Sequence, residues 1–241
     1  MAQVNLTKTG IWQANGAIPN PNLLINGDFH SRISKTTDWD TSLNGTLLAS
    51  SWGGYNGGVS NPSTGYHAHL FLLNGEYVYR YVNENGRWLG ISQGGLQSKM
   101  AASTAYTFSC DQYIPSDSNN YLHGGLYYFK TGATSAGFHA GSFSGNNKTK
   151  KGQWGKVVFT FTTTSDIDLS KNVSWYIYGY GGTGTVYMKN PKLELGNKVS
   201  PFVLSVTETY DAWPHGFIET SYKDTHLYKQ EYIDANQFYE I

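Results

Sequence analysis

The sequence predicts an all-β fold, a β-sandwich of the jelly-roll kind, on three observations. Short apolar stretches of alternating polarity recur roughly every 10–20 residues, with Gly, Asn and Ser turn signals between them. No stretch carries the capped i, i+3, i+4, i+7 apolar stripe that an amphipathic helix needs. The composition, with 28 Gly, 19 Tyr and 7 Trp in 241 residues, is typical of many short strands joined by tight turns.

The alternating stretches define the strands that we expect. They are residues 69–73, 77–82, 88–93, 105–110, 125–130, 154–163, 173–180 and 186–195, preceded by a short apolar strand closed by a turn over residues 22–29. Within 105–110, Tyr106, Phe108 and Cys110 share one side and are expected in the core. Because Cys110 is the only cysteine, the chain forms no intrachain disulfide.

The chain divides into three parts by composition. Residues 1–19 are polar, with Gly, Asn and Pro, and are interpreted as an N-terminal arm. Residues 20–204 form the predicted jelly roll. Residues 205–241 are rich in aromatic and acidic side chains but too few for a core of their own. We expect this aromatic C-terminal extension to pack on the sandwich or on a partner subunit.

The charge balance excludes two classes of partner. Lys+Arg and Asp+Glu are both 17, so the formal net charge is zero. Such a chain lacks the basic footprint of a nucleic-acid-binding protein and the polybasic segment of a membrane-surface protein. No apolar run approaches the about 18 residues of a membrane-spanning helix. We therefore expect neither nucleic acid nor membrane as a partner.

Metal-binding patterns are incomplete. Residues 38–40 (Asp-Trp-Asp) open like a calcium loop, but the third ligand, the Gly at position six and the closing Glu do not follow. His67 and His69 would share a strand face, yet no Cys or carboxylate at ligand spacing completes a site. We expect no metal site and no cofactor from these residues.

Catalytic patterns are equally weak. No Gly-x-Ser-x-Gly elbow occurs. Asp111 with Glu76 or Glu84 could be read as the carboxylate pair of a glycosidase. With 17 acidic residues some such pair is always available, so we assign no catalytic residue and do not expect an enzyme.

Outward-facing aromatic rows are the best candidate for a binding surface. In a jelly roll one sheet is concave, and its outward residues meet the ligand. Val78 and Val82, like Trp175 and Ile177, suit the core, which turns the alternating tyrosines outward. Flat rings stack on sugar C–H groups, and neighbouring polar groups bind sugar hydroxyls. The candidate carbohydrate-binding residues are Tyr79, Tyr81, Arg80, Asp111, Tyr113, Tyr176, Tyr178 and, at the rim in a Gly-rich loop, Trp52. Burial of the same rows by a neighbouring subunit is the alternative.

Two motifs carry a resemblance to a known family. One is Asn-Leu-Leu-Ile-Asn-Gly-Asp-Phe at residues 22–29. The other is Tyr-Met-Lys-Asn-Pro-Lys-Leu-Glu-Leu-Gly-Asn-Lys-Val-Ser-Pro-Phe at 187–202. With residues 88–93 and 105–109 between them, residues 20–204 resemble the jelly-roll carbohydrate-binding modules of the family 4, 9 and 22 type. They resemble more closely the versions in tail, baseplate and fibre proteins of phages of Gram-positive bacteria.

The resemblance also implies a structural calcium ion, and here the sequence departs from it. A Glu commonly follows the opening motif in the saccharide-binding modules, where this chain has His30. The closing strand usually carries an Asp pair, where this chain has Lys189 and Asn190. Asp28 and backbone carbonyls could compensate in part, so a structural calcium stays an alternative.

The resemblance implies a phage virion accessory protein that adheres to host cell-surface polysaccharide. Such a protein would contact other virion proteins and form a homo-oligomer, with a trimer favoured. The start of the chain has no signal-peptide pattern, so we expect a virion protein made in the host cytoplasm. Two alternatives stay open: a purely structural virion or capsid-decorating protein, and a module detached from a polysaccharide-degrading enzyme.

Overall fold

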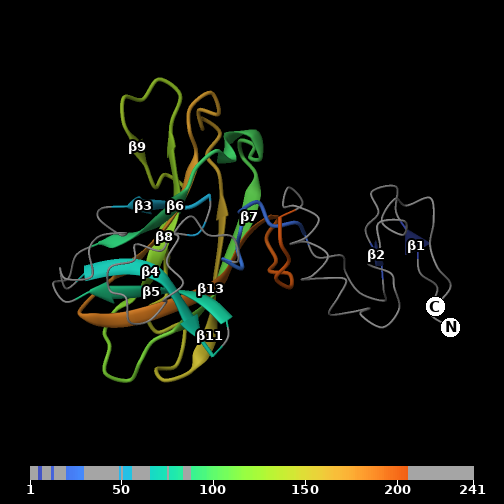
Figure 1. The fold of residues 1–241 in the computed structure, drawn as a ribbon. Helices are drawn as coiled ribbons and strands as arrows, with labels where there is room; N and C mark the ends of the chain where they lie inside the picture. Colours follow the sequence, from blue (N-terminus) through green and yellow to red (C-terminus); the bar gives the residue numbers. More distant parts are fainter. Residues whose placement is uncertain are drawn as a thin grey trace.

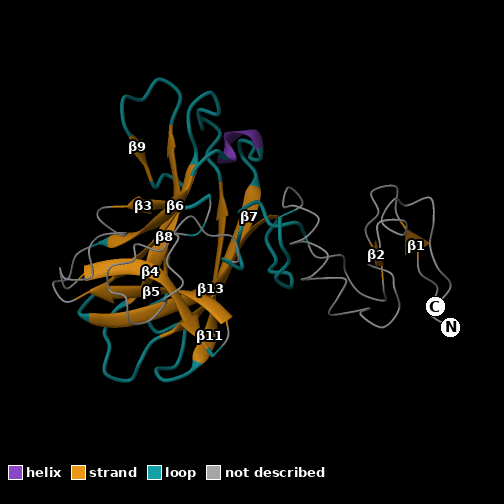
Figure 2. Cartoon of the chain, in the orientation of Figure 1, coloured by secondary structure: helices purple, strands orange, loops and turns teal. Residues whose placement is uncertain are grey.

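The chain folds as a two-layer antiparallel β-sandwich, as predicted. The computed structural model describes residues 5–6, 12–13, 20–29, 49, 51–55, 66–74, 76–83 and 88–205. Within these residues the two sheets lie against each other as layers (Figure 1). The one helical element in the described ranges is the short 3-10 turn η2 (Leu96–Ser98), drawn in purple in Figure 2. The all-β jelly-roll prediction is therefore confirmed.

One layer is a six-stranded sheet with β12 at its centre. Its order is β10-β8-β12-β6-β3, with β9 pairing with β8 beside β10. The strands are β3 (Gly53–Tyr55), β6 (Leu89–Gln93), β8 (Tyr121–Phe129), β9 (Ala136–Gly137), β10 (Phe143–Ser144) and β12 (Ser174–Tyr180).

The other layer is a five-stranded sheet with β13 at its centre. Its order is β11-β7-β13-β5-β4, and every pairing is antiparallel. The strands are β4 (Tyr66–Leu73), β5 (Glu76–Asn83), β7 (Ala105–Tyr113), β11 (Trp154–Thr162) and β13 (Gly184–Leu195). A separate pair, β1 (Asn5–Leu6) with β2 (Trp12–Gln13), falls within the predicted arm.

Aromatic rings fill the space between the sheets. Trp175 is fully buried, and its ring centroid lies 4.6 Å from that of Phe108 and 5.6 Å from that of Phe161. Leu122, Leu126, Ile177, Met188 and Leu193 surround them in one continuous core. Cys110 is buried in the same cluster, and burial raises the pKa of its thiol. The inward row that we predicted for β7 is thus confirmed.

A buried glutamine joins the two layers. The Gln112 amide of β7 donates to the Gly145 carbonyl at 3.0 Å and to Thr149 Oγ1 at 2.8 Å, and its oxygen accepts the Leu122 N–H of β8 at 2.8 Å. Because the described contacts use the oxygen and the amide nitrogen of this side chain, its burial carries little of the usual desolvation cost.

The prediction for β5 had the wrong face inward. Tyr79 and Tyr81 were expected to point outward, but both are fully buried in the core, so neither can contact a ligand. The Tyr79 hydroxyl accepts the Ala49 N–H at 2.9 Å, and the Tyr81 hydroxyl lies 4.0 Å from Met188 Sδ. Val78, expected in the core, is buried on the opposite side across from Phe71. The charged Arg80 interrupts the Val78–Val82 row, whereas Tyr77, Tyr79 and Tyr81 form an unbroken aromatic row, so the alternation itself favours the tyrosines inward.

Two further expectations are corrected. Trp52, predicted at a cleft rim, is 3% exposed; its Nε1 donates to the Asn26 carbonyl at 3.2 Å and its ring packs on Phe29. Residues 22–29 form bends and turns, not a strand, with Asn26 and Phe29 at positive φ.

Several predictions fall outside the described residues. They concern most of residues 1–19, His30, residues 38–40, Glu84, the side chain of His67, and residues 206–241.

Candidate functional site

The structure divides the predicted site residues among three places. Tyr79, Tyr81 and Trp52 lie in the core. Tyr176 and Tyr178 lie on the outward face of the six-stranded sheet, since they alternate with buried Trp175 and Ile177. The last three, Arg80, Asp111 and Tyr113, lie on the outward face of the five-stranded sheet. The eight residues therefore do not form one site.

The outward side of the six-stranded sheet, here called the six-strand face, is a cluster of aromatic rings. Register places Tyr178 between Gly90 of β6 and His123 of β8, and Tyr180 across from Tyr121. Ring centroids of neighbouring members lie 4.9–6.5 Å apart. The members are Trp88, Tyr121, His123, Tyr127, Phe138, Tyr176, Tyr178 and Tyr180.

Trp88 is the most exposed ring of this face. It is 46% exposed and stacks on Tyr178 at a centroid distance of 5.7 Å and an interplanar angle of 6°. The edge of Tyr180 supports it at 4.9 Å. Tyr178 points outward as predicted, but at 2% exposure it is a support for Trp88 and not a contact surface. Tyr176 is half-buried.

His123 is the titratable member of this face. Its imidazole stacks on Tyr178 at 5.3 Å and lies 5.0 Å from Tyr180. Burial lowers the pKa of His123 below its ordinary value of 6.5, because charging the ring among apolar neighbours costs solvation energy. The eight aromatic members of this cluster are therefore uncharged at neutral pH.

The outward side of the five-stranded sheet, here called the five-strand face, carries both rings and charges. Tyr113 is half-buried between Tyr187 and Trp154, with centroid distances of 5.9 and 5.7 Å. Asp111 pairs with Lys156 at 2.9 Å and accepts a hydrogen bond from Asn190 Nδ2 at 2.9 Å. Glu76, the other described carboxylate that we considered for catalysis, pairs with Lys189.

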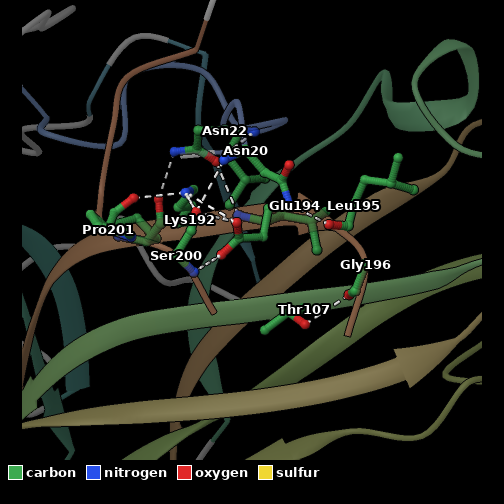
Figure 3. A network of polar contacts seen from close by, with 12 residues as sticks. Asn20, Asn22, Thr107, Lys192, Glu194, Leu195, Gly196, Ser200 and Pro201 are labelled. Atoms are coloured by element: carbon green, nitrogen blue, oxygen red, sulfur yellow. Dashed lines mark hydrogen bonds and ion pairs between the residues drawn. The ribbon is translucent and has the colours of Figure 1, made fainter. Parts of the chain in front are cut away.

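The closing motif forms a buried polar network (Figure 3). Lys192 and Glu194 have fully buried side chains and pair at 3.2 Å. Lys192 Nζ also donates to Ser200 Oγ and to the Pro201 carbonyl, at 2.5 and 2.7 Å. The Glu194 carboxylate accepts hydrogen bonds from the Ser200 N–H at 2.8 Å and from the Ser200 hydroxyl at 2.5 Å. Burial lowers the pKa of Lys192, and the Glu194 carboxylate opposes that shift.

The opening motif docks onto the same strand. Asn22 Oδ1 accepts the Leu193 N–H at 3.0 Å and Asn22 Nδ2 donates to the Pro191 carbonyl at 3.0 Å. The Leu23 N–H donates to the Leu193 carbonyl at 2.7 Å. A Cβ on Gly27 would stand 2.8 Å from the Pro191 oxygen, so only glycine allows this approach. The two motifs that carry the family resemblance thus meet, and their described contacts are structural.

The described residues at the expected calcium positions, Lys189 and Asn190, do not fit a calcium site. Lys189 presents an ammonium group, and Asn190 directs its amide nitrogen toward Asp111. Calcium requires six to eight oxygen ligands. In the described part of the chain, no group of three or more His, Cys, Asp or Glu side chains could hold a metal ion. Nor does any helix there have the length and hydropathy to cross a membrane.

Comparison with solved structures finds carbohydrate-binding modules of similar fold. The C-terminal family 22 module of Clostridium thermocellum Xyn10B aligns with a TM-score of 0.46 and 12% identity over 64% of this chain and 91% of that chain. The CBM22-1 xylan-binding domain of Paenibacillus barcinonensis Xyn10C gives 0.45 and 12% over 76% and 100%. A family 4 module gives 0.44 and 14% over 71% and 98%. No family model and no curated protein matches the chain.

Our site predictions missed several exposed or half-exposed rings, among them Trp88, Trp154 and Tyr187. A signal for each was present, because Trp88 alternates with the apolar pair Leu89 and Ile91, and Tyr187 with Val186 and Met188.

Proposed function

We propose that this chain is a carbohydrate-binding module that holds a neutral polysaccharide against its six-strand face. The observation that carries the proposal is the exposed indole of Trp88, laid flat on Tyr178. A contiguous aromatic patch with an exposed ring of this kind is typical of a binding surface.

The support under Trp88 suits recognition of a sugar ring. Pyranose rings present flat patches of C–H groups that stack on aromatic faces. A ring already held by Tyr178 and Tyr180 loses little conformational entropy when it binds, which favours affinity. Tyrosine hydroxyls of the same face offer hydrogen bonds at the edge of the rings.

The chemistry of the face favours an uncharged ligand. Apart from His123, whose lowered pKa keeps it neutral, the members of the six-strand face have no ionisable group that charges near pH 7. Gly90 and Ser92 of β6, which stand across from Tyr178 and Tyr176, add little side-chain bulk. A shallow surface of this kind binds each sugar weakly and gains strength when several copies act together.

Replacing Trp88 tests the proposal. The wild-type protein is expected to be retained by at least one of a panel of insoluble neutral polysaccharides (cellulose, xylan, mannan and chitin). Trp88→Ala should weaken that binding about 30-fold, the loss typical of a central aromatic anchor. Depletion isotherms and affinity electrophoresis would measure it.

Trp154→Ala is the matched control, because Trp154 is a tryptophan of similar exposure on the opposite face. It should leave binding to the neutral polysaccharide unchanged, and thermal melting should show both variants folded. The proposal would be overturned if none of the polysaccharides retained the wild-type protein, or if Trp88→Ala bound as tightly as wild type. That result would favour the purely structural role.

For the biological setting, we propose an accessory protein of a phage virion, where the module would attach to host cell-surface polysaccharide. The support is the sequence resemblance of the closing motif, residues 187–202, together with the opening motif. A module detached from a polysaccharide-degrading enzyme fits the same geometry. The genes beside the coding sequence distinguish the two, since virion structural genes favour the first and glycoside hydrolase genes the second.

A further inference from the structure

The five-strand face carries an aromatic row that crosses the sheet. The row begins with Phe71 on β4, continues through Tyr187 on β13 and Tyr113 on β7, and ends with Trp154 on β11. Successive ring centroids lie 6.1, 5.9 and 5.7 Å apart. Tyr187, Tyr113 and Trp154 stand directly across from one another in the strand register.

This row is accessible from outside. Trp154 is 36% exposed, and Phe71, Tyr113 and Tyr187 are half-buried. Their neighbours along each strand point into the core, as Met188 and Gln112 do. The rings therefore form a band on the side of the sandwich opposite the six-strand face.

A cation lies over the ring at each end of the row. The Arg80 guanidinium carbon is 5.4 Å from the Phe71 centroid, and Lys189 Nζ is 4.8 Å from the Trp154 centroid. These cation–π contacts hold the charged groups beside the rings. A ligand that stacks on the row would thus reach a positive charge at either end.

Arg80 differs from the other charged side chains of this face. Lys189 pairs with Glu76 and Lys156 pairs with Asp111. Among the described residues no carboxylate pairs with Arg80, and its buried Nε has no hydrogen-bond partner there. The two ion pairs cancel, so the Arg80 guanidinium gives this group of five charged side chains a net positive charge.

We propose that the five-strand face is a second glycan site, for a polysaccharide of uronic acid residues. The rings of Tyr113, Tyr187 and Trp154 would stack on successive sugars. The Arg80 guanidinium would bind a sugar carboxylate, since its donors match that group in geometry and charge. This inference goes beyond the proposed function and does not depend on it, because the two faces share no residue.

The test uses alginate and the same alginate with its carboxyl groups reduced to alcohols. The wild-type protein is expected to bind alginate, more weakly as salt is raised. Arg80→Met, which keeps the apolar stem, should lose about tenfold or more in affinity for alginate. Binding to the carboxyl-reduced polymer should be weaker for the wild type and unchanged by Arg80→Met. Trp154→Ala should weaken binding to alginate.

Two control variants separate binding at this face from non-specific charge attraction and from binding at the six-strand face. Lys198→Met removes a positive charge from an exposed position outside the row and should leave alginate binding unchanged. Trp88→Ala should also bind alginate as wild type, so a failure of the six-strand site is seen separately. Three results would overturn the proposal. The wild type could fail to bind alginate, Arg80→Met and Lys198→Met could lose alginate affinity equally, or Trp154→Ala could dissociate an oligomer. The last outcome would assign the face to a subunit interface.

Discussion

Tyrosine side chains have two different roles in this molecule, according to the side of the strand on which they lie. Tyr79 and Tyr81 fill the core, where burial raises the pKa of both phenols. Tyr113 and Tyr187 lie on an outward face with their rings partly open. The residue type alone does not distinguish these roles. A phenol suits a core when a protein group pairs with its hydroxyl, and it suits a sugar surface when the hydroxyl is left to bind the ligand.

Tyr79→Phe tests the core role at the residue scale. The change leaves the buried Ala49 N–H without its acceptor, so the free energy of unfolding should fall by about 1–3 kcal/mol. Urea unfolding with an unchanged m-value would measure it. Glycan binding should not change.

Tyr187→Phe is the control for that experiment, since it removes the same hydroxyl from an outward position. Its stability should stay within about 0.5 kcal/mol of wild type. If Tyr79→Phe kept full stability and lost polysaccharide binding, the assignment of Tyr79 to the core would be wrong.

At the scale of elements, β13 organises the closing of the sandwich. It pairs with β5 and β7, receives the opening segment through Asn22, and carries the buried Lys192–Glu194 pair. The register shift between Lys189 and Lys192, with Asn190 at φ 54°, lies in the same strand. A bulge of this kind re-aims the side chains that follow it, and here those side chains enter the network of Figure 3.

A double-mutant cycle on Lys192 and Glu194 tests this network. Lys192→Met or Glu194→Leu alone leaves one charge buried without its counterion, and each should cost about 3–5 kcal/mol of unfolding free energy. The double variant should cost much less than the sum, because it buries no charge. Chemical unfolding of the four proteins would give the coupling. Additive effects would show that the pair does not act as a unit.

At the scale of the whole molecule, the sandwich separates two aromatic surfaces of different charge. The described rings of the six-strand face are uncharged at neutral pH, whereas the five-strand face carries Arg80 and two ion pairs. Since stacked sheets lie about 10 Å apart, ligands on the two outward faces would not collide. If both proposals hold, one molecule could join two polysaccharide chains.

A bridging experiment tests this arrangement. Wild-type protein is expected to carry fluorescent alginate onto the neutral insoluble polysaccharide that it binds. Trp88→Ala should stay in solution with the alginate, and Arg80→Met should bind the solid without alginate. A mixture of the two variants should not bridge, because neither molecule has both sites. Bridging by either single variant would contradict two independent faces.

Local patterns in the sequence predict the fold class and the position of most strands. Alternation and turn signals predicted the eight main strands from β4 to β13 within a few residues, because a two-residue period and Gly-rich turns are local properties. The inward Tyr106, Phe108 and Cys110 of β7 and the inward Trp175 and Ile177 of β12 followed from the same alternation.

The surface that each aromatic residue occupies depends on packing between segments that are distant in the sequence. In β5 the tyrosine row faces the core, where the Ala49 N–H donates to the Tyr79 hydroxyl, and the charged Arg80 lies on the outward row. Trp52 became a core residue because a distant carbonyl, that of Asn26, accepts its N–H. Strand order places Arg80, Asp111 and Tyr113 on one sheet and Tyr176 and Tyr178 on the other. This order brings together strands that are far apart in the sequence, so no local pattern encodes it.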